Sequence, residues 1–409
     1  AGGVRAVVYV PADDPAQAAA PRPVLVYIHG GGFVIGSPES HAPTARELAV
    51  GAGCIVVSLD YRMGPEHKAP AAVDDAVAAT EWVLDHAAEF GGDPARVAVT
   101  GNLKFDALDL NDFFNVATNA VGTGDHTQQS TYDEWGCLWQ RSEVANMGQV
   151  RGHPLEDWSA YGHHAWPDPD AAWYYEGMEE RFAGSEGKYV TTGIFMLLFE
   201  RMHSLRGMTN VLTELYTDRG RMEELADRIV DFDVRVIENL GRMFTGRIHG
   251  MHFSDDWGTE LATFVSPKMW CSFFQPRYAR IFEAMHAQGW DVWMHTCGKV
   301  NEIIEPLIEI GLDAINLQQP RALGIEEIGD RFGGRICFES LCDIQATLPF
   351  KDADEISQEA RLLLKHWATP QGGFVLSDYG DGEAIGVPLW KKQVMLDAFR
   401  EHDPYLQRA

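Results

Sequence analysis

The sequence lacks any long hydrophobic run, since its longest apolar stretches fall far short of the roughly 20 residues that cross a lipid bilayer. No signal peptide is visible where the chain opens with Ala1-Gly2-Gly3. The lack of a long apolar run argues against a membrane-spanning protein. With 45% hydrophobic and 23% charged residues, the composition is typical of a folded globular protein. We expect it in the cytoplasm.

Basic residues are scarce, because 33 Lys and Arg stand against 60 Asp and Glu, a formal net charge of −27. Nucleic acids and anionic membrane surfaces are polyanions and repel a chain of this charge. We therefore expect neither as a partner, and we expect a small-molecule substrate instead.

Paired cysteine spacing is absent. The six cysteines are scattered without the regular spacing of a disulfide framework. A chain of this size builds its core without cross-links, and reduced thiols fit a cytoplasmic protein. The length of 409 residues predicts two domains.

The first hundred residues have the pattern of an α/β sheet. Apolar or alternating runs predict strands, and longer amphipathic stretches between them predict helices, a rhythm that implies parallel pairing. The predicted strands are residues 4–10, 24–28, 55–59 and 97–100, and the predicted helices are residues 42–50 and 71–90.

A glycine run, His29-Gly30-Gly31-Gly32-Phe33, follows the second of these strands. Three glycines let backbone N–H groups point into one space, as in an oxyanion hole for acyl transfer. With Asp60-Tyr61-Arg62, Pro65-Glu66-His67 and Asp74-Asp75, the run resembles the hormone-sensitive-lipase-like branch of the α/β-hydrolases over residues 4–101. The resemblance implies that Gly30 and Gly31 are the remnant of an oxyanion hole.

The nucleophile of that family is missing. The family places a serine in a Gly-x-Ser-x-Gly turn after the strand at 97–100, where this chain reads Gly101-Asn102-Leu103-Lys104-Phe105. An oxyanion hole without a nucleophile does not hydrolyse an ester by the family mechanism. We therefore predict a truncated α/β-hydrolase-like segment, residues 1–102, without esterase activity. Its last strand should present an apolar, unpaired edge.

The character of the sequence changes abruptly between Thr100 and Asp112, without the Pro-, Gly- or Ser-rich linker that normally joins domains. We therefore interpret the chain as chimera-like, with one part at residues 1–102 and another at residues 103–409.

The second part has the pattern of a (β/α)8 TIM-type barrel, so the predicted fold class is α/β, a barrel preceded by a partial α/β-hydrolase sheet. Six strands alternate with helices. One or two further strands must come from residues 103–188 or be missing, which would leave the barrel incomplete at its start. The predicted strands are residues 189–192, 248–253, 292–294, 314–317, 335–338 and 374–376. The predicted helices are residues 221–243, 269–288, 301–310, 325–331, 355–367 and 389–402.

Polar clusters follow two of these strands. The first runs from His252 to Gly258, and the second is His295-Thr296-Cys297-Gly298. Parallel α/β proteins keep their chemistry at the carboxyl ends of successive strands. We therefore expect the active site here.

Residues from about 110 to 409 resemble the uroporphyrinogen-decarboxylase-like superfamily. That group also contains methyltransferases that move methyl groups between corrinoid proteins and thiols. The matching motifs are Phe199-Glu200-Arg201, Leu205-Arg206-Gly207, Phe253-Ser254-Asp255-Asp256-Trp257-Gly258, Ser266-Pro267, His295-Thr296-Cys297-Gly298, Leu307-Ile308-Glu309-Ile310-Gly311, Asp343-Ile344-Gln345 and Leu348-Pro349.

The methyltransferase branch binds zinc through a His-x-Cys pair and a further cysteine in the last strand. His295 and Cys297 match the pair, so the resemblance implies zinc here. The further cysteine is not matched, and Asp378, Glu339 or Cys342 remain alternatives for the third ligand. The structural alternative is that Cys297 is a buried apolar residue and His295 a hydrogen-bonded histidine at a strand end.

The decarboxylase branch uses no metal. It relies on an arginine-rich amino-terminal segment and on a histidine in the last strand, and this sequence shows neither.

The remaining site residues are assigned by their position in these motifs. Asp255 and Asp256 would orient a metal ligand or bind a cationic part of the substrate. Alternatively, Asp255 caps the following segment and Asp256 pairs with an arginine such as Arg206. The predicted catalytic residues are Asp255, Asp256 and Glu339, and the predicted substrate-binding residues are His252, Arg206 and Asp378.

The leading functional hypothesis is zinc-assisted methyl transfer between a corrinoid, carried by a partner protein, and a thiol. Three alternatives remain open. They are a catalytically inactive fusion of two incomplete enzymes, a carboxylesterase or lipase-like α/β-hydrolase, and a metal-free decarboxylase of a tetrapyrrole precursor.

Overall fold

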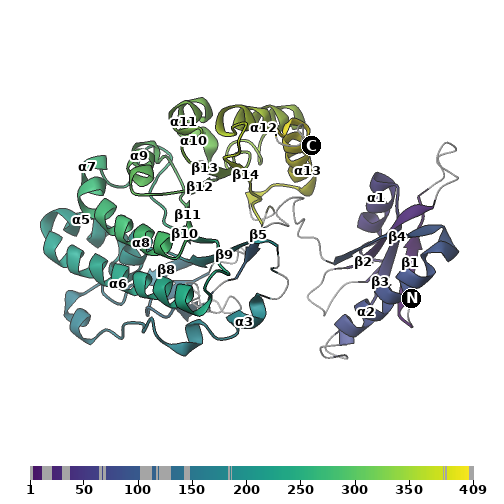
Figure 1. Cartoon of the computed structure of the whole chain (residues 1–409), viewed down its shortest axis with the longest axis horizontal. Helices are drawn as coiled ribbons and strands as arrows, with labels where there is room; N and C mark the ends of the chain where they lie inside the picture. Colours follow the sequence, from purple (N-terminus) through teal and green to yellow (C-terminus); the bar gives the residue numbers. More distant parts are fainter. Residues whose placement is uncertain are drawn as a thin grey trace. The chain divides into compact units, whose positions relative to one another are not determined.

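The computed structural model divides the chain into two compact units, Ala1–Asp106 and Ala107–Ala409 (Figure 1). The residues that the structure describes are 3–11, 21–29, 37–63, 67, 71–101, 113–116, 118, 130–141, 148–182, 185, 187–380, 382 and 385–404. Gly30 and Gly31, the predicted oxyanion-hole remnant, lie outside the described residues.

The first unit contains a four-stranded sheet with the order β1-β3-β2-β4. Its strands are β1 (Arg5–Tyr9), β2 (Arg22–Ile28), β3 (Ile55–Asp60) and β4 (Gly92–Gly101), and its helices are α1 (Ala42–Ala52), α2 (Ala71–His86) and the 3-10 turn η1 (Ala87–Phe90). Strands β2, β3 and β4 pair in parallel as predicted, but β1 pairs with β3 in the antiparallel direction. The prediction missed this because an alternating run sets which side chains face inward and not the direction of the strand.

Alternate residues of β2 point to opposite faces of this sheet. Val26 packs in one apolar cluster with Val83 of α2, whereas Tyr27 packs in a second cluster with Ala45 of α1. The two helices therefore cover opposite faces of the sheet.

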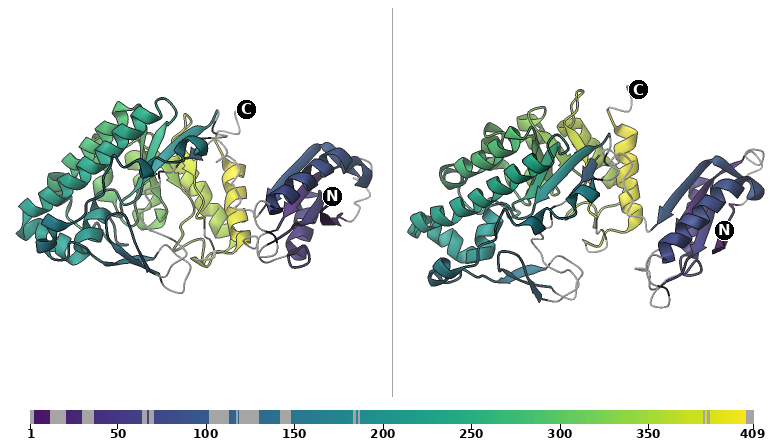
Figure 2. Two further views of the ribbon diagram at one scale, coloured as in Figure 1. Left: turned by 90° about the horizontal axis from the view of Figure 1, so that it is seen from below. Right: turned by 60° about the horizontal axis from the view of Figure 1, so that its bottom comes forward.

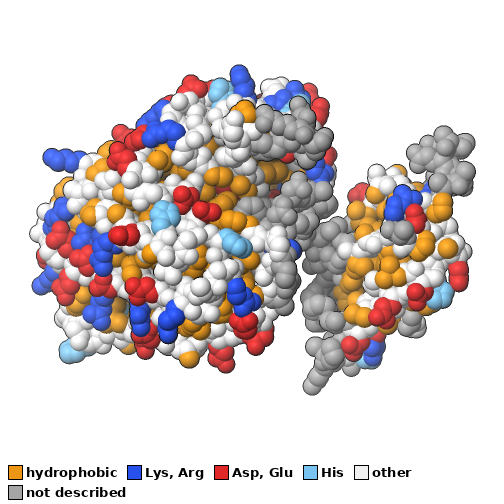
Figure 3. Space-filling view, viewed as in Figure 1, with side chains coloured by type: hydrophobic (Ala, Val, Ile, Leu, Met, Phe, Trp, Pro, Cys, Tyr) orange, Lys and Arg blue, Asp and Glu red, His pale blue; other side chains and the backbone are white. Residues whose placement is uncertain are grey.

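Strand β4 ends the sheet order, and among the described residues it pairs only with β2. Val99 on this strand is 49% exposed. Within the first unit, the predicted apolar edge is therefore confirmed. Figure 3 shows further hydrophobic side chains exposed on the face of this unit that it presents.

The second unit is built on a seven-stranded, all-parallel sheet with the order β14-β13-β12-β11-β10-β9-β5. The strands are β5 (Phe113–Asn115), β9 (Tyr189–Ile194), β10 (Gly250–Ser254), β11 (Asp291–His295), β12 (Ala314–Leu317), β13 (Cys337–Ser340) and β14 (Phe374–Leu376). β5 supplies a strand expected from residues 103–188. No pairing joins β5 to β14 among the described residues, so the fold is of the TIM-barrel type without a described closure.

Helices follow successive strands of this sheet and lie on its outer side (Figure 2). They are α4 (Phe199–Arg206), α5 (Met208–Thr217), α6 (Arg219–Met243), α7 (Pro267–Met269), the π-helical turn η5 (Trp270–Phe274), α8 (Gln275–Ala287), α9 (Asn301–Glu309), α10 (Pro320–Leu323), α11 (Ile325–Phe332), α12 (Ala353–Trp367) and α13 (Leu389–His402). Local signals mark their starts. Ser266 accepts a hydrogen bond from Met269 N, and Asp352 and Glu355 form a capping box at α12.

Residues 130–141 and 148–182 form a small subdomain that packs on α4 and shares the hydrophobic core of the second unit. A three-stranded antiparallel sheet joins β6 (Ser130–Tyr132), β7 (Leu138–Gln140) and β8 (Gln149–Gly152). Short turns follow: η3 (Trp158–His163), η4 (Ala172–Tyr174) and α3 (Met178–Arg181). Asp133, between β6 and β7, forms a buried ion pair with Arg201 of α4 at 2.9 Å. This pair attaches the subdomain to the main sheet.

Among the described helices, none combines the length and the apolar character that crossing a lipid bilayer requires.

Asp233 of α6 is buried, and its Oδ2 has no hydrogen-bond partner among the described residues. Burial raises its pKa well above the usual range. Above about pH 3.9 the unfolded chain loses this proton while the folded chain keeps it, so stability falls as pH rises toward the folded pKa. We expect Asp233→Asn to raise the free energy of unfolding at pH 7 by about 1–3 kcal/mol, and by less at pH 4. Scanning calorimetry at both pH values measures this.

The matched control is Asp397→Asn, whose side chain on α13 is 60% exposed and which should change stability by less than about 0.5 kcal/mol. An equal effect of Asp233→Asn at the two pH values would contradict the prediction.

Candidate active site

A cavity of about 760 Å³ lies at the carboxyl ends of the central strands of the second unit. Strands β9 to β13 and the loops after them contribute most of its lining, together with Asn115 and Thr118 near β5 and Tyr379 and Ile385 after β14. Its polar lining residues in this part are Glu200, His252, Ser254, Asp256, His295, Cys297, Asn316, Gln318, Gln319, Glu339 and Gln345.

Four of these residues lie in one row across the sheet. Ser254 of β10 is in register with His295 of β11, His295 with Asn316 of β12, and Asn316 with Glu339 of β13. Neighbouring strands are about 4.8 Å apart. The polar row therefore places a histidine, an amide and a carboxyl group side by side on the cavity wall.

Asp256, His295 and Cys297 form a cluster that fits a metal ion. Their donor atoms all lie within 4.8 Å of one another. His295 Nε2 is 3.4 Å from Cys297 Sγ and 3.7 Å from Asp256 Oδ1. Nitrogen, sulfur and oxygen donors of this kind suit zinc, which uses three protein ligands when one position stays open for a substrate.

The ring of His295 is oriented by Asn316. His295 Nδ1 lies 2.6 Å from Asn316 Oδ1, which has only lone pairs to offer, so Nδ1 carries the proton and donates it. Nε2 is then left as a lone-pair donor facing Cys297 and Asp256. Metal-binding histidines in proteins are held in this way by an acceptor at the other ring nitrogen.

The loops that carry Asp256 and Cys297 bind each other closely. Cys297 N donates to Asp256 Oδ1 at 2.8 Å, and Gly258 N donates to Cys297 O at 3.1 Å. A Cβ on Gly298 would lie 2.3 Å from the backbone of Gly258, and Gly298 has a φ of +83°. Glycine is therefore required at Gly298 for the backbone conformation and for the close approach.

Trp257 anchors the first of these loops. Its ring is fully buried and stacks on Phe199, with 4.3 Å between the ring centroids, and its indole N–H donates to Tyr278 at 2.9 Å. Its backbone N–H donates to the hydroxyl of Thr296 at 3.1 Å. The two sequence motifs therefore form one interlocked unit that presents the metal cluster.

Asp255, predicted as catalytic, is fully buried and does not line the cavity. Its carboxyl group accepts hydrogen bonds from the backbone N–H groups of Leu198, Phe199 and Glu200 and from the hydroxyl of Tyr278. Burial raises its pKa to about 6. The placement gives no support to a catalytic role, because the side chain caps the start of α4.

Arg206 and Asp378, both predicted to bind substrate, do not line the cavity either. Arg206 forms an ion pair with Glu214 and donates to the carbonyl of Leu155, so it does not pair with Asp256. Asp378 forms an ion pair with Lys392 at 2.9 Å. Their charges are already compensated elsewhere in the fold.

The third donor beside His295 and Cys297 differs from the three alternatives drawn from the sequence. Cys342 is fully buried and its thiol donates to a carbonyl in α12, and Asp378 is paired with Lys392. Glu339 lines the cavity but is not one of the clustered donors. The structure instead brings Asp256 to His295 and Cys297.

Glu200 and His252 complete the wall beside the cluster. Glu200 accepts a hydrogen bond from the Ser254 hydroxyl at 2.9 Å, and burial, followed by the charges of Asp256 and Asp255, raises its pKa to about 8. Burial lowers the pKa of His252 to about 4, with a smaller contribution from His295. His252, predicted to bind substrate, lines the cavity, and so does Glu200, which was not among the predicted site residues.

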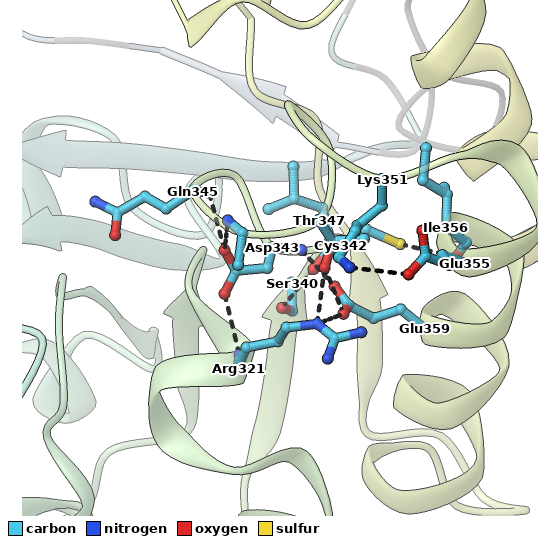
Figure 4. Close-up of polar contacts among 12 residues, drawn as sticks. Arg321, Ser340, Cys342, Asp343, Gln345, Thr347, Lys351, Glu355, Ile356 and Glu359 are labelled. Carbon is cyan, nitrogen blue, oxygen red and sulfur yellow. Dashed lines mark hydrogen bonds and ion pairs between the residues drawn. The ribbon is translucent and has the colours of Figure 1, made fainter.

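The loop after β13, which carries Ile344 and Gln345 to the cavity, is fixed by a buried carboxyl group of α12 (Figure 4). Glu359 accepts hydrogen bonds from Asp343 N and from the Thr347 hydroxyl, both at 2.7 Å, and forms an ion pair with Arg321. Burial raises the pKa of Glu359. Gln345 points away from this cluster in Figure 4.

Asn316→Ala should lower the zinc affinity of the chain about 10–100-fold, because His295 loses the acceptor that orients its ring. Competition with a chromogenic zinc chelator measures the change. Gln318→Ala, which removes a neighbouring amide that also lines the cavity, is the matched control. Equal affinities for Asn316→Ala and the unchanged chain would contradict the prediction.

Residues 190–402 match the uroporphyrinogen decarboxylase (URO-D) family. The chain belongs to the URO-D family. The match covers β9 after its first residue, the strands β10 to β14, and the cluster of Asp256, His295 and Cys297. Among solved structures, a methyltransferase from Methanosarcina mazei aligns with 17% identity and a TM-score of 0.49, over 66% of this chain and 76% of that chain.

The segment that precedes the URO-D match has different relatives. Residues 25–102 match a family with the alpha/beta hydrolase fold. Esterase LipI of Mycobacterium tuberculosis is 51% identical over 102 residues, which are 25% of this chain and 31% of that protein. Carboxylesterase NlhH of the same species is 58% identical over 80 residues, which are 20% of this chain and 25% of that protein.

The chain thus spans about a quarter to a third of the length of these hydrolases. The two resemblances seen in the sequence, one for each part of a chimera-like chain, are confirmed.

Proposed function

We propose that the URO-D unit transfers a methyl group between a corrinoid, carried by a partner protein, and a small-molecule thiol held at a zinc ion. The observation that supports the metal is the cluster of Asp256, His295 and Cys297 at the cavity wall. The reaction type comes from the motifs shared with the methyltransferase branch of the family.

A bound zinc ion would lower the pKa of a substrate thiol, so that the reactive thiolate exists at neutral pH. Residues of the chain position the donor atoms for such an ion. Asn316 holds His295 with Nε2 free, and the interlocked loops hold Cys297 beside Asp256. Burial, followed by the charge of Asp256, raises the pKa of the Cys297 thiol well above its usual range. A thiolate at Cys297 therefore needs a cation beside it.

The lining of the cavity disfavours the metal-free decarboxylase. That reaction needs cationic side chains to bind the carboxylates of a tetrapyrrole precursor. Among the described residues that line the cavity there is no Lys or Arg, while Glu200, Asp256 and Glu339 are present. A polycarboxylate substrate would therefore find no Lys or Arg among the described lining residues to bind its carboxylates.

A methyl-transfer assay tests the proposal. The zinc-loaded chain is mixed with methylcobalamin as the methyl donor and 2-mercaptoethanol as the acceptor, and the methylated thiol is measured by mass spectrometry. We expect His295→Ala or Cys297→Ala to slow the reaction at least about 100-fold. Cys271→Ala, which removes a thiol on η5 that does not line the cavity, should not. Equal rates in all variants would contradict the proposal, and no reaction with any of them would favour the inactive fusion.

Ester hydrolysis is the second candidate function, because the chain is 58% identical to a carboxylesterase over 80 residues. We expect no turnover of a short-chain nitrophenyl ester above the rate in buffer, since the position of the family nucleophile holds Leu103 in place of serine. A spectrophotometric assay measures this. Turnover that is abolished by Gly30→Ala or Gly31→Ala would contradict the prediction.

A further inference from the structure

The wall of the cavity beyond the metal cluster is acidic and amide-rich. Along the polar row, Asn316 separates His295 from Glu339, so the backbones that carry His295 and Glu339 are two strand spacings, roughly 10 Å, apart. Amides of Gln318, Gln319 and Gln345 also line this side. A substrate bound at the metal cluster therefore has Glu339 within reach of its other end.

Glu339 is a carboxyl group without a described cationic partner. No ion pair of Glu339 is present among the described residues, and the described cavity lining contains no Lys or Arg. In the stretches of the second unit outside the described residues, the sequence has one arginine, Arg408 near the chain end, no lysine, and one histidine, His126. The nearest histidine of the row, His295, is turned toward Asn316 and the metal cluster.

The charge on the metal side does not compensate Glu339. A Cys297 thiolate and the Asp256 carboxylate together carry two negative charges, which balance those of a divalent cation. Glu200 and Glu339 then remain as acidic groups of the wall; Glu200 already accepts a hydrogen bond from the Ser254 hydroxyl, and Glu339 lies on the side of the wall beyond Asn316. Burial raises the pKa of Glu339 to about 7, opposed by a hydrogen bond from the side chain of Asn316. A cation placed against it would restore its charged form.

We propose that the cavity selects a thiol with a cationic amino group, and that Glu339 is the specificity-determining residue that binds this group. The inference rests on the proposed function for the sulfur end of the substrate. The ammonium group donates charge-assisted hydrogen bonds to the Glu339 carboxylate. An acidic thiol, such as one that carries a sulfonate, meets Glu339 with the same sign of charge and is disfavoured.

Three thiols of the same length test this selection. They are 2-mercaptoethylamine (cationic), 2-mercaptoethanol (neutral) and 2-mercaptoethanesulfonate (anionic). Calorimetric titration into the zinc-loaded chain gives a dissociation constant for each, and the zinc content after titration shows that the metal has stayed bound. We expect the amine to bind at least about tenfold more tightly than the sulfonate.

Glu339→Gln, which keeps the size and removes the charge, should bring the affinities of the amine and the sulfonate to within about threefold of each other. Glu302→Gln on the exposed surface of α9 removes one charge elsewhere and should keep the preference. If Glu339→Gln does not fold, Glu339→Asp replaces it and should weaken the preference.

The outcomes separate the two proposals. A sulfonate that binds as tightly as the amine, or a preference that persists in Glu339→Gln, overturns the selection while the thiol site stands. Failure of 2-mercaptoethanol and of both charged thiols to bind overturns the proposed function and the selection with it.

Discussion

Replacing His295 and Cys297 together by alanine should remove the zinc from the purified chain, from about one ion per chain to near none. The change leaves Asp256 as one donor of the three that now lie within 4.8 Å of one another. A single exposed carboxylate holds zinc too weakly to survive purification. Mass spectrometry of the metal content, on chains purified from zinc-supplemented cells, measures the loss.

A double variant with Cys271→Ala and His286→Ala is the matched control. It removes the same residue types from outside the cavity, since His286 pairs with Asp313 at the surface. Zinc that persists without His295 and Cys297, or that is lost in the control, would contradict the site.

The third ligand is tested in the same way. Asp256→Asn should lower zinc affinity at least about tenfold, because an anionic donor of the cluster is lost. Asp378→Asn should not, since Asp378 already pairs with Lys392 outside the cavity. A larger loss of zinc affinity for Asp378→Asn than for Asp256→Asn would contradict the prediction and would favour Asp378 as the third ligand.

Asp133→Ala should destabilise the second unit by about 3–5 kcal/mol. The Asp133 carboxylate accepts hydrogen bonds from the backbone N–H groups of Trp135 and Cys137, from the indole of Trp139, and from Arg201. The side chains of Asp133 and Arg201 are 0% and 2% exposed. Removing the acid leaves the guanidinium buried without its main counter-charge. Scanning calorimetry of the unfolding transition measures the loss.

Asp231→Ala breaks an exposed pair with Arg280 and should cost less than about 1 kcal/mol. The double variant Asp133→Ala, Arg201→Leu should lose less stability than the sum of its two single variants, because no unpaired charge remains. A loss for Asp133→Ala no larger than that for Asp231→Ala would contradict the prediction.

Periodicity predicted most of the fold. The strands at 314–317 and 374–376 and the helix at 389–402 have the predicted bounds, and the other predicted elements of the second unit differ by a few residues at their ends. The helices α4, α5 and α10 were not predicted. The direction of β1 could not be predicted, because its alternation is the same in either direction. The antiparallel sheet of residues 130–152 was missed because its strands are three or four residues long, too short for a period to show.

The sequence predicted those site residues that lie in local motifs, and not the contacts between motifs. His295, Cys297 and Asp256 were predicted as site residues because they lie in polar clusters at the ends of two predicted strands. Asp255 and Asp256 look equivalent in the sequence, yet adjacent residues point in different directions, so one caps α4 and the other lines the cavity. Asn316 lies beside His295, and Glu339 beside Asn316, through strand register, and register between distant strands leaves no local pattern.

The order of strands in the large sheet also bears on how the chain folds during synthesis. From β9 to β14 each strand pairs with the next one along the chain, so these strands can be added in turn as they leave the ribosome. β5 is the exception, because it pairs with β9, which follows it only after more than 70 residues that include the β6–β8 sheet. Closing that loop is the step with the largest entropy cost in the sheet. A ribosome stalled shortly after β9 should therefore carry a nascent chain that proteases cut far more readily than one stalled after β10.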